Sequence, residues 1–148
     1  MSDELNMMPD LQSSLLCDDV RQERNGKFML IGLFDSIASQ QFPIRYPRLF
    51  TVNRWCSGQG EFKQMTRILK PNQEDALVEG KQIPVKLPDP QSTATNVEVF
   101  VNVSFDGPGV YWVEVTLEET LKLRYPLRVG QVQLPAGGQQ QQPPPPKA

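Results

Sequence analysis

The chain has 148 residues, of which 39% are hydrophobic and 22% are charged, and its formal net charge is −2; this is the composition of an ordinary globular domain. It contains no histidine, which excludes Ser-His-Asp and Cys-His catalysis, histidine-ligated zinc and acid–base catalysis by histidine. The two cysteines, Cys17 and Cys56, are too few for a four-thiolate zinc site, and we expect both to be reduced thiols packed as small hydrophobic side chains.

No segment has the pattern of a membrane helix or a secretory signal. The longest apolar run, residues 28–34, is much shorter than the ~20 residues that a transmembrane helix needs. Residues 1–5 are acidic, whereas a signal peptide begins with basic residues. We therefore expect a cytoplasmic protein that has no membrane partner.

The first two strands are predicted to form a β-hairpin. Residues 12–21 and 27–37 flank Asn25-Gly26, and Asn-Gly is a strong hairpin signal because both residues tolerate the positive φ of a type I′ turn. The second run is almost uninterruptedly apolar, which favours a strand buried on both faces at the centre of a sheet. Residues 39–47 contain two prolines, so we expect a connection there and not a central strand.

The rest of the chain continues as short strands. Residues 49–57 and 61–69 alternate imperfectly, which leaves open either a bulge or two partly covered faces. In residues 82–87, Pro84 marks an edge strand. Residues 97–105 place valine at every second position up to Phe105, and we expect one buried face there. Residues 111–117 and 121–129 alternate in the same way.

This pattern predicts an all-β fold, an antiparallel β-sandwich of about eight strands that is immunoglobulin-like or C2-like. Residues 107–111 resemble a corner of immunoglobulin-like sandwiches at which a tyrosine hydroxyl bonds back to the backbone. We expect a flexible N-terminal arm at residues 1–10, the β-sandwich domain at residues 11–134 and a disordered Gly/Gln/Pro-rich tail at residues 135–148.

Motifs at both ends of the expected sandwich carry a family resemblance. They are Cys17-Asp18-Asp19-Val20-Arg21, Asn25-Gly26-Lys27, Gly32-Leu33-Phe34-Asp35 and Pro126-Leu127-Arg128-Val129. Over about residues 11–130 the chain resembles a bacterial family of small uncharacterised all-β proteins. The resemblance implies a β-sandwich of unknown function, so it assigns no catalytic residues. The chain departs from the family at Glu118-Glu119, where an Asp-Gly turn is expected.

The adjacent carboxylates Asp18 and Asp19 suggest a metal site or an acid/base pair, the basis of a carboxylate-based enzyme. Neighbours on a strand point to opposite faces, so the two converge on one ion only where a bulge turns them. The alternative is a structural polar cluster of Asp18, Asp19, Arg21 and Arg54 at the rim of the core. We favour this structural role, with Arg54 as the partner, and expect no metal, no cofactor and no catalytic residue.

Basic residues are concentrated in one part of the chain. Residues 20–70 hold nine bases and three acids, a balance of +6, whereas residues 1–19 hold five acids and no base. This basic 20–70 segment is a candidate surface for an acidic partner. The alternative is that its charges lie on solvated faces and edges, where they discourage aggregation. No RNP-type, zinc-finger or helix-turn-helix pattern is present, so nucleic acid is not expected as a partner.

Trp112 alternates with Tyr111 and Val113, so its side chain lies on the opposite face of the strand. Either Trp112 points outward and its two neighbours point into the core, or Trp112 points into the core and its neighbours point outward. An outward Trp112 together with Phe100 would form an apolar patch for a protein partner or a homodimer, with Arg54 as a further candidate binding residue. We therefore expect a non-enzymatic structural or protein-interaction module that binds through this face or through the edge of the first hairpin. The sequence identifies no small-molecule substrate, no particular partner and no oligomeric state.

Overall fold

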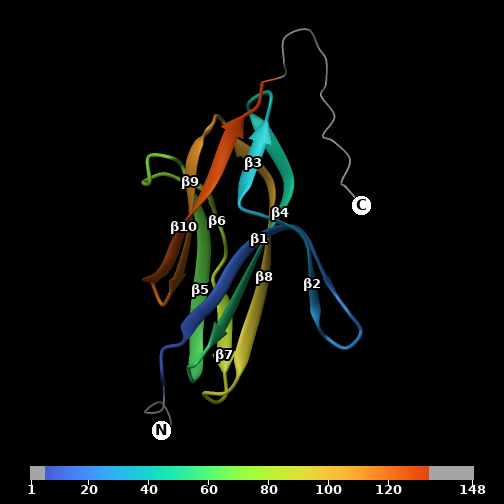
Figure 1. The fold of residues 1–148 in the computed structure, drawn as a ribbon. Helices are drawn as coiled ribbons and strands as arrows, with labels where there is room; N and C mark the ends of the chain where they lie inside the picture. Colours follow the sequence, from blue (N-terminus) through green and yellow to red (C-terminus); the bar gives the residue numbers. More distant parts are fainter. Residues whose placement is uncertain (1–5, 134–148) are drawn as a thin grey trace, which may run out of the picture.

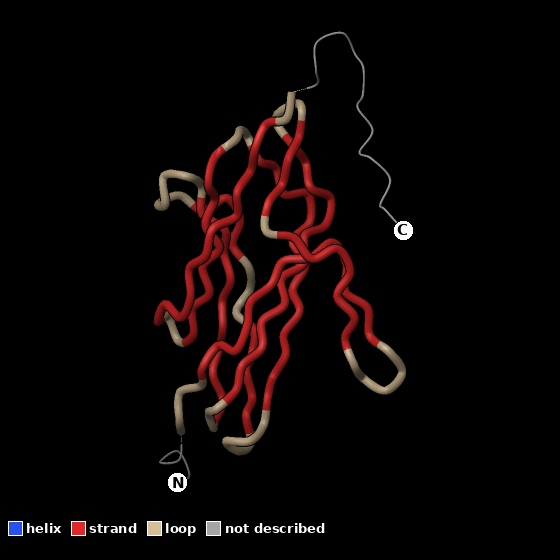
Figure 2. The backbone as a smooth tube through the Cα atoms, in the orientation of Figure 1, coloured by secondary structure: helices blue, strands red, loops and turns tan. Residues whose placement is uncertain are grey.

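The computed structural model describes residues 6–133, which form ten β-strands and no helix (Figure 1, Figure 2). The strands are β1 (Asp10–Gln22), β2 (Phe28–Phe34), β3 (Ser36–Ser39), β4 (Ile44–Cys56), β5 (Gly60–Leu69), β6 (Ala76–Glu79), β7 (Ile83–Leu87), β8 (Thr93–Phe105), β9 (Gly109–Leu117) and β10 (Thr120–Gln131). Within this part of the chain there is no helix long and apolar enough to cross a membrane. The expected tail at residues 135–148 lies outside the described residues.

The strands form two sheets that pack together (Figure 1). One sheet has four strands in the order β2-β1-β4-β8, and the other has six, with β3-β10-β9-β5-β6 in order and β7 beside β5. Neighbouring strands are antiparallel except for β3 and β10, which are parallel. The predicted all-β sandwich is therefore confirmed.

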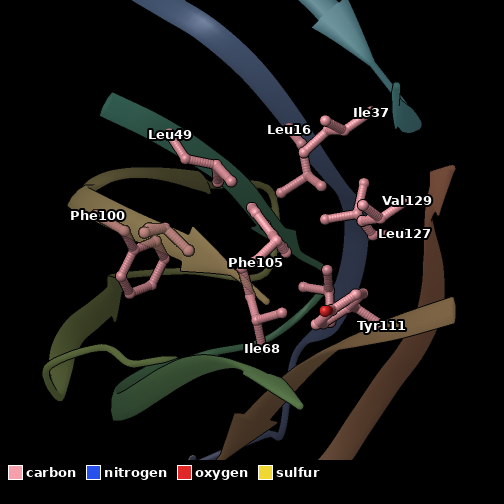
Figure 3. Packing of buried hydrophobic residues seen from close by; sticks show 11 residues of the cluster. Leu16, Ile37, Leu49, Ile68, Phe100, Phe105, Tyr111, Leu127 and Val129 are labelled. Carbon is pink, nitrogen blue, oxygen red and sulfur yellow. The ribbon is translucent and has the colours of Figure 1, made fainter. Parts of the chain in front are cut away.

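The core lies between the inner faces of the two sheets. Its largest cluster joins Leu49 and Phe105 of the four-stranded sheet to Tyr111 of the six-stranded sheet (Figure 3). Every second residue of the segment 111–117 is buried, as the alternation predicts. The Tyr111 hydroxyl donates a hydrogen bond to the Gly107 carbonyl at 2.8 Å, which confirms the bond expected at this corner.

The prediction that β2 is a central strand is wrong, because β2 lies at the edge of the four-stranded sheet. It pairs with β1 alone among the described strands, and the hairpin stands away from the sandwich (Figure 1). Phe28, Met29, Ile31 and Leu33 are 36%, 46%, 41% and 58% exposed. An uninterrupted apolar run is therefore no proof of burial on both faces.

The hairpin turn forms at Asn25-Gly26, but it is not of type I′. Glu23 N donates to Lys27 O at 2.8 Å, and Gly26 N donates to Glu23 O at 2.8 Å. Gly26 has a φ of 92°, whereas Asn25 has no positive φ. This is a three-residue loop with glycine at the left-handed position, and it replaces the predicted two-residue turn.

The single buried face predicted for residues 97–105 is also wrong. Val103 is buried, but Val99 and Val101 are 44% and 63% exposed, and Phe100 between them is buried. Asn102 has a φ of 53°, and the alternation of β8 is interrupted at this residue. Even-numbered residues such as Phe100 face the core before Asn102, and odd-numbered residues such as Val103 face it afterwards. The valines that precede Asn102 therefore lie on the outer face of the sandwich.

The connection expected at residues 39–47 ends early, because β4 begins at Ile44. Pro47 is tolerated in β4 because β1 pairs with β4 only from Phe50 onward, so that this part of β4 has β8 as its one partner among the described strands. The prediction for Pro84 is confirmed, since β7 pairs with β5 alone in the described chain.

Residues 6–9 lie against the sandwich, although they fall within the segment expected to be a flexible arm. Met7 and Gln59 exchange two backbone hydrogen bonds of 2.7 and 2.9 Å, and Pro9 is buried. The sandwich therefore includes residues that precede the expected boundary at residue 11.

Candidate functional site

Trp112 and Phe100 lie in different layers of the sandwich, so the predicted patch that joins them is wrong. Phe100 is 5% exposed and belongs to the central core cluster. Trp112 is half-buried on the outer face of the six-stranded sheet, since its neighbours Tyr111 and Val113 face the core. The outward position of Trp112 was one of the two alternatives that the sequence left open.

The polar cluster at Asp19 forms with a different arginine from the one predicted. Asp19 lies 3.2 Å from Arg21 Nε and 3.6 Å from Arg48 Nη2, measured to its carboxylate oxygens. Arg54 donates instead from Nε to Thr95 Oγ1 at 2.8 Å. The prediction of Arg54 as the carboxylate partner is therefore wrong, and Arg48 of the same strand takes that role.

Asp18 has its own partner, because it accepts a hydrogen bond from the Tyr46 hydroxyl. Burial and this hydrogen bond raise the pKa of Tyr46. Asp18 and Asp19 thus contact different groups, as expected for neighbours on a strand. Within residues 6–133, no three His, Cys, Asp or Glu side chains are grouped in a way that could hold a metal ion.

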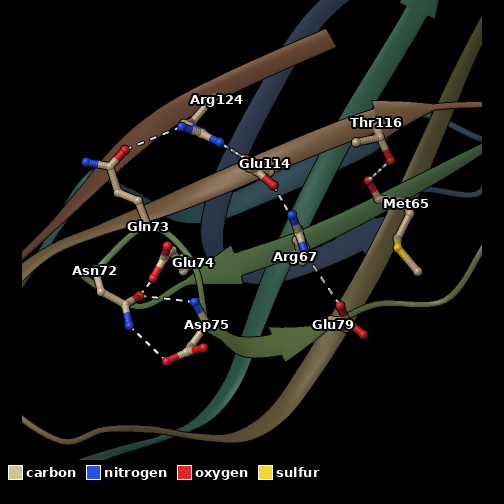
Figure 4. A network of polar contacts seen from close by, with 10 residues as sticks. All are labelled: Met65, Arg67, Asn72, Gln73, Glu74, Asp75, Glu79, Glu114, Thr116 and Arg124. Atoms are coloured by element: carbon tan, nitrogen blue, oxygen red, sulfur yellow. Dashed lines mark hydrogen bonds and ion pairs between the residues drawn. The ribbon is translucent and has the colours of Figure 1, made fainter. Parts of the chain in front are cut away.

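The outer face of the six-stranded sheet holds a buried carboxylate that the sequence analysis did not single out. Glu114 is 3% exposed and accepts hydrogen bonds from Arg67 Nε and Arg124 Nε, both at 2.8 Å (Figure 4). Burial alone would raise the pKa of Glu114, but the hydrogen bonds from the two arginines outweigh it and lower the pKa. The network joins β5, β9 and β10, so its role is structural, and it occupies Arg67 of the basic segment.

The outer edge of β2 is apolar, and no strand within residues 6–133 pairs with it. Its seven residues, FMLIGLF, include no charge and no proline, the two devices that commonly protect an edge strand. Glu23 N donates to Lys27 O, and hydrogen-bonded and non-hydrogen-bonded pairs alternate along an antiparallel ladder. Phe28 and Leu30 therefore belong to non-hydrogen-bonded pairs, and their backbone N–H and C=O groups point away from β1. These groups are free to pair with a further strand.

Two hollows adjoin β2. A groove of about 650 Å³ separates the hairpin tip from the outer face of the four-stranded sheet, and a hollow of about 280 Å³ lies beside Leu33 and Asp35. Lys27 and Arg54 place two cations among the residues that line the groove. Its lining residues are Gln12, Ser13, Leu15, Asn25, Gly26, Lys27, Phe28, Leu30, Val52, Arg54 and Thr95.

The sheet face next to these hollows is apolar as well. Leu15, Val99 and Val101 are 37%, 44% and 63% exposed. The guanidinium carbon of Arg48 lies 5.1 Å from the centroid of the Phe50 ring and covers part of this face. Exposed apolar side chains beside an edge strand make this part of the molecule a candidate for an interaction surface. We call the outer edge of β2 together with the 650 Å³ groove the β2 surface.

Residues 12–130 match a family of unknown function, DUF6941. The chain belongs to this family. The expected membership in a family of uncharacterised all-β domains is thus confirmed. No curated protein matches the chain. The segment that matches DUF6941 contains the whole of the β2 surface.

Proposed function

We propose that this DUF6941 domain is a protein-interaction module without enzymatic activity, and that it binds its partner through the β2 surface. The observation that carries the proposal is the seven-residue apolar strand β2. One of its edges has no partner among the described strands, and four of its side chains are at least a third exposed. A long, uncharged edge strand pairs readily with another chain, and natural proteins usually blunt such edges.

Strand addition is the binding mode that this geometry supports. The outward backbone groups of Phe28 and Leu30 offer hydrogen bonds, which supply affinity. The groove and the hollow beside Leu33 offer room for side chains of an added strand, which supply specificity. Apolar contacts are not screened by salt, so this binding should persist at high ionic strength.

The absence of enzymatic activity is supported by what surrounds the reactive groups. Asp18 is bonded to Tyr46, and Asp19 is paired with arginines, so neither carboxylate is free for acid–base work. Cys17 is fully buried, and burial raises the pKa of its thiol, which favours the unreactive protonated form. Cys17 and Cys56 are free thiols, which supports a reducing cytoplasm as the setting.

A second candidate function is binding of an acidic partner by the basic rim of the same groove. Lys27 and Arg54 line it, and neither has a carboxylate within salt-bridge distance among the described residues. This mode differs from strand addition in one measurable respect, because its affinity should fall steeply as salt rises.

The test uses a photo-crosslinking amino acid at Met29, which is 46% exposed on β2. The captured protein is then purified, and its affinity is measured for the wild type, for Ile31→Lys and for Leu121→Lys. Leu121 is the matched control, because it is 49% exposed but lies on β10 in the other sheet. A lysine on an edge strand blocks strand addition.

We expect the purified protein to bind the wild type and Leu121→Lys equally at ~0.05 M and ~0.5 M salt, and to lose binding to Ile31→Lys. Equal binding of Ile31→Lys would contradict the proposal. A steep loss of affinity at the higher salt, abolished by Arg54→Gln, would instead support the acidic partner.

A further inference from the structure

We propose that the interior of the sandwich binds ordered water in a polar layer that joins β4, β5 and β8. This polar layer consists of Thr51 and Asn53 of β4, Gln64 and Thr66 of β5, and Glu98 of β8. The first four side chains are no more than 1% exposed, and Glu98 is half-buried. The layer lies between the inner faces of the two sheets, whereas the β2 surface lies on the outside of the molecule.

The polar layer divides the apolar core into two parts. Along the inner face of β4, Thr51 and Asn53 lie between Leu49 of the largest core cluster and Trp55 of a second cluster. The polar residues of β5 and β8 lie between the same two clusters, whose members on these strands are Phe62, Ile68, Ala94 and Phe100. Three strands thus place polar side chains at one level of the core, where burial is costly unless each polar atom is hydrogen-bonded.

Four buried side-chain atoms of the described residues have no hydrogen-bond partner, and all four belong to the polar layer. They are Thr51 Oγ1, Asn53 Oδ1, Gln64 Nε2 and Glu98 Oε1. Buried polar atoms of native proteins are almost always bonded to protein groups or to ordered water. Their concentration at one level of the core points to a bound ligand that all of them share.

The hydrogen bonds within the layer fix the orientation of both amides. The Trp55 indole N–H can only donate, and it contacts Gln64 Oε1 at 2.7 Å, so Gln64 Nε2 faces elsewhere. Asn53 Nδ2 donates to Thr66 Oγ1 at 2.9 Å and to Gln64 Oε1 at 3.4 Å. An exchange of the oxygen and nitrogen of Asn53 would set its oxygen against Gln64 Oε1, and both atoms are acceptors. Rotation of the amides therefore does not provide the missing partners.

The chemistry of the four atoms selects the ligand. Asn53 Oδ1 and Glu98 Oε1 accept hydrogen bonds, whereas Gln64 Nε2 donates them. The Thr51 hydroxyl does either. A metal ion suits the oxygens but not the N–H groups of Gln64, and an anion suits only the donors. Water both donates and accepts, and a buried water makes about two to four such bonds.

The strand register brings two of these atoms within reach of one water molecule. Thr51 and Glu98 are direct Cα partners on neighbouring strands. The Cβ atoms of such a pair are about 4.5–5.5 Å apart. A bridging water spans about 5.5 Å, because each of its hydrogen bonds is about 2.8 Å long. Glu98 Oε2 is bonded to Lys81 N at 2.8 Å, which leaves Glu98 Oε1 for the water.

A crystal structure of the full chain tests the proposal, with Thr51→Val and Thr66→Val as matched variants. Both threonines are no more than 1% exposed, but Thr66 is bonded directly to Asn53, whereas Thr51 has no protein partner. We expect water within about 3.2 Å of Thr51 Oγ1 and Asn53 Oδ1 in the wild type. This water should remain in Thr66→Val and be lost from Thr51→Val. Direct bonds among the four atoms, with no water between them, would overturn the proposal.

Nuclear magnetic resonance gives an independent readout in solution, because internal water produces nuclear Overhauser cross-peaks with neighbouring amide protons. We expect such cross-peaks between water and the side-chain amide protons of Gln64 in the wild type, and their absence would overturn the proposal. The wild type alone gives this answer, so the proposal stays testable if a variant does not fold.

A metal ion in the layer is the competing outcome. It would raise the melting temperature when Na⁺, K⁺ or Ca²⁺ replaces choline at constant ionic strength, and Glu98→Gln would abolish the rise. That result would overturn the proposal. We expect the melting temperatures of the wild type and of Glu98→Gln to respond equally to the change of cation.

Discussion

Gly32 of β2 lies against the side chain of Asp18 on β1, so closely that a Cβ added to Gly32 would be 2.8 Å from Asp18 Cγ. Gly32 also has a φ of 73°, in the left-handed region that non-glycine residues rarely adopt. Asp18 is in turn fixed by the Tyr46 hydroxyl of β4. Glycine is therefore required in β2 for two independent reasons.

Gly32→Ala should lower the free energy of unfolding by roughly 1–3 kcal/mol, because the substitution adds both a clash and backbone strain. The measurement is urea unfolding. Gly130→Ala is the matched control, since a Cβ at Gly130 meets nothing within 4 Å and its φ is not in the left-handed region. Equal effects of the two substitutions would contradict this account of Gly32.

Glu119→Gly should stabilise the protein. Glu118 and Glu119 both have positive φ, at 49° and 67°, which is the type I′ geometry without the glycine that suits it. Relief of the strain at Glu119 should raise the free energy of unfolding by about 1 kcal/mol. Glu118 is kept, because its carboxylate accepts a hydrogen bond from Lys63 N at 2.8 Å. Thermal unfolding checks this prediction, and an unchanged or lower melting temperature would count against it.

Gln64 and Trp55 should be energetically coupled. The Trp55 indole N–H donates to Gln64 Oε1 at 2.7 Å, and both side chains are no more than 1% exposed. Gln64→Leu leaves the buried indole N–H unpaired, at a cost of about 1–3 kcal/mol. Trp55→Phe removes that donor, so the double variant should be more stable than the sum of the single effects predicts. A double-mutant cycle by chemical denaturation measures the coupling, and additivity would refute it.

Glu114 should make stability depend on acid pH. Its pKa is lowered in the folded state, so its contribution is complete above the pKa of an unfolded glutamate, about 4.3, and is lost as pH falls toward the folded pKa. Glu114→Gln should therefore reduce stability at pH 7 and flatten the loss of stability between about pH 5 and pH 3. Urea midpoints across that range test this, and an acid dependence as steep as that of the wild type would exclude Glu114 as its source.

The last strands of the fold were predictable because local pattern and tertiary position agree there. The inward residues of β9, such as Tyr111, alternate with outward ones, and the Tyr111 bond to Gly107 is a local feature. In β8 the same pattern misleads. Val99 and Val101 continue the alternation of Val103, yet one residue with positive φ, Asn102, turns them to the outer face.

The candidate surface was predictable only in part. The sequence indicates the first hairpin and its apolar run, but an apolar run suits a central strand and an edge strand equally well. The partner of Asp19 depends on the register between β1 and β4. Strand alternation alone places Arg48 and Arg54 on the same face of β4, so it does not distinguish between them. The neighbours that settle both questions are distant in sequence, since β1 pairs with β4 as well as with β2.

The most direct test of the central claim is the affinity of the protein captured at Met29 for the wild type, for Ile31→Lys and for its control Leu121→Lys, measured at ~0.05 M and ~0.5 M salt. If β2 is the interaction edge, the wild type and Leu121→Lys bind equally at both salt concentrations and Ile31→Lys does not bind. Capture of no protein at Met29, or binding that survives Ile31→Lys, would contradict it.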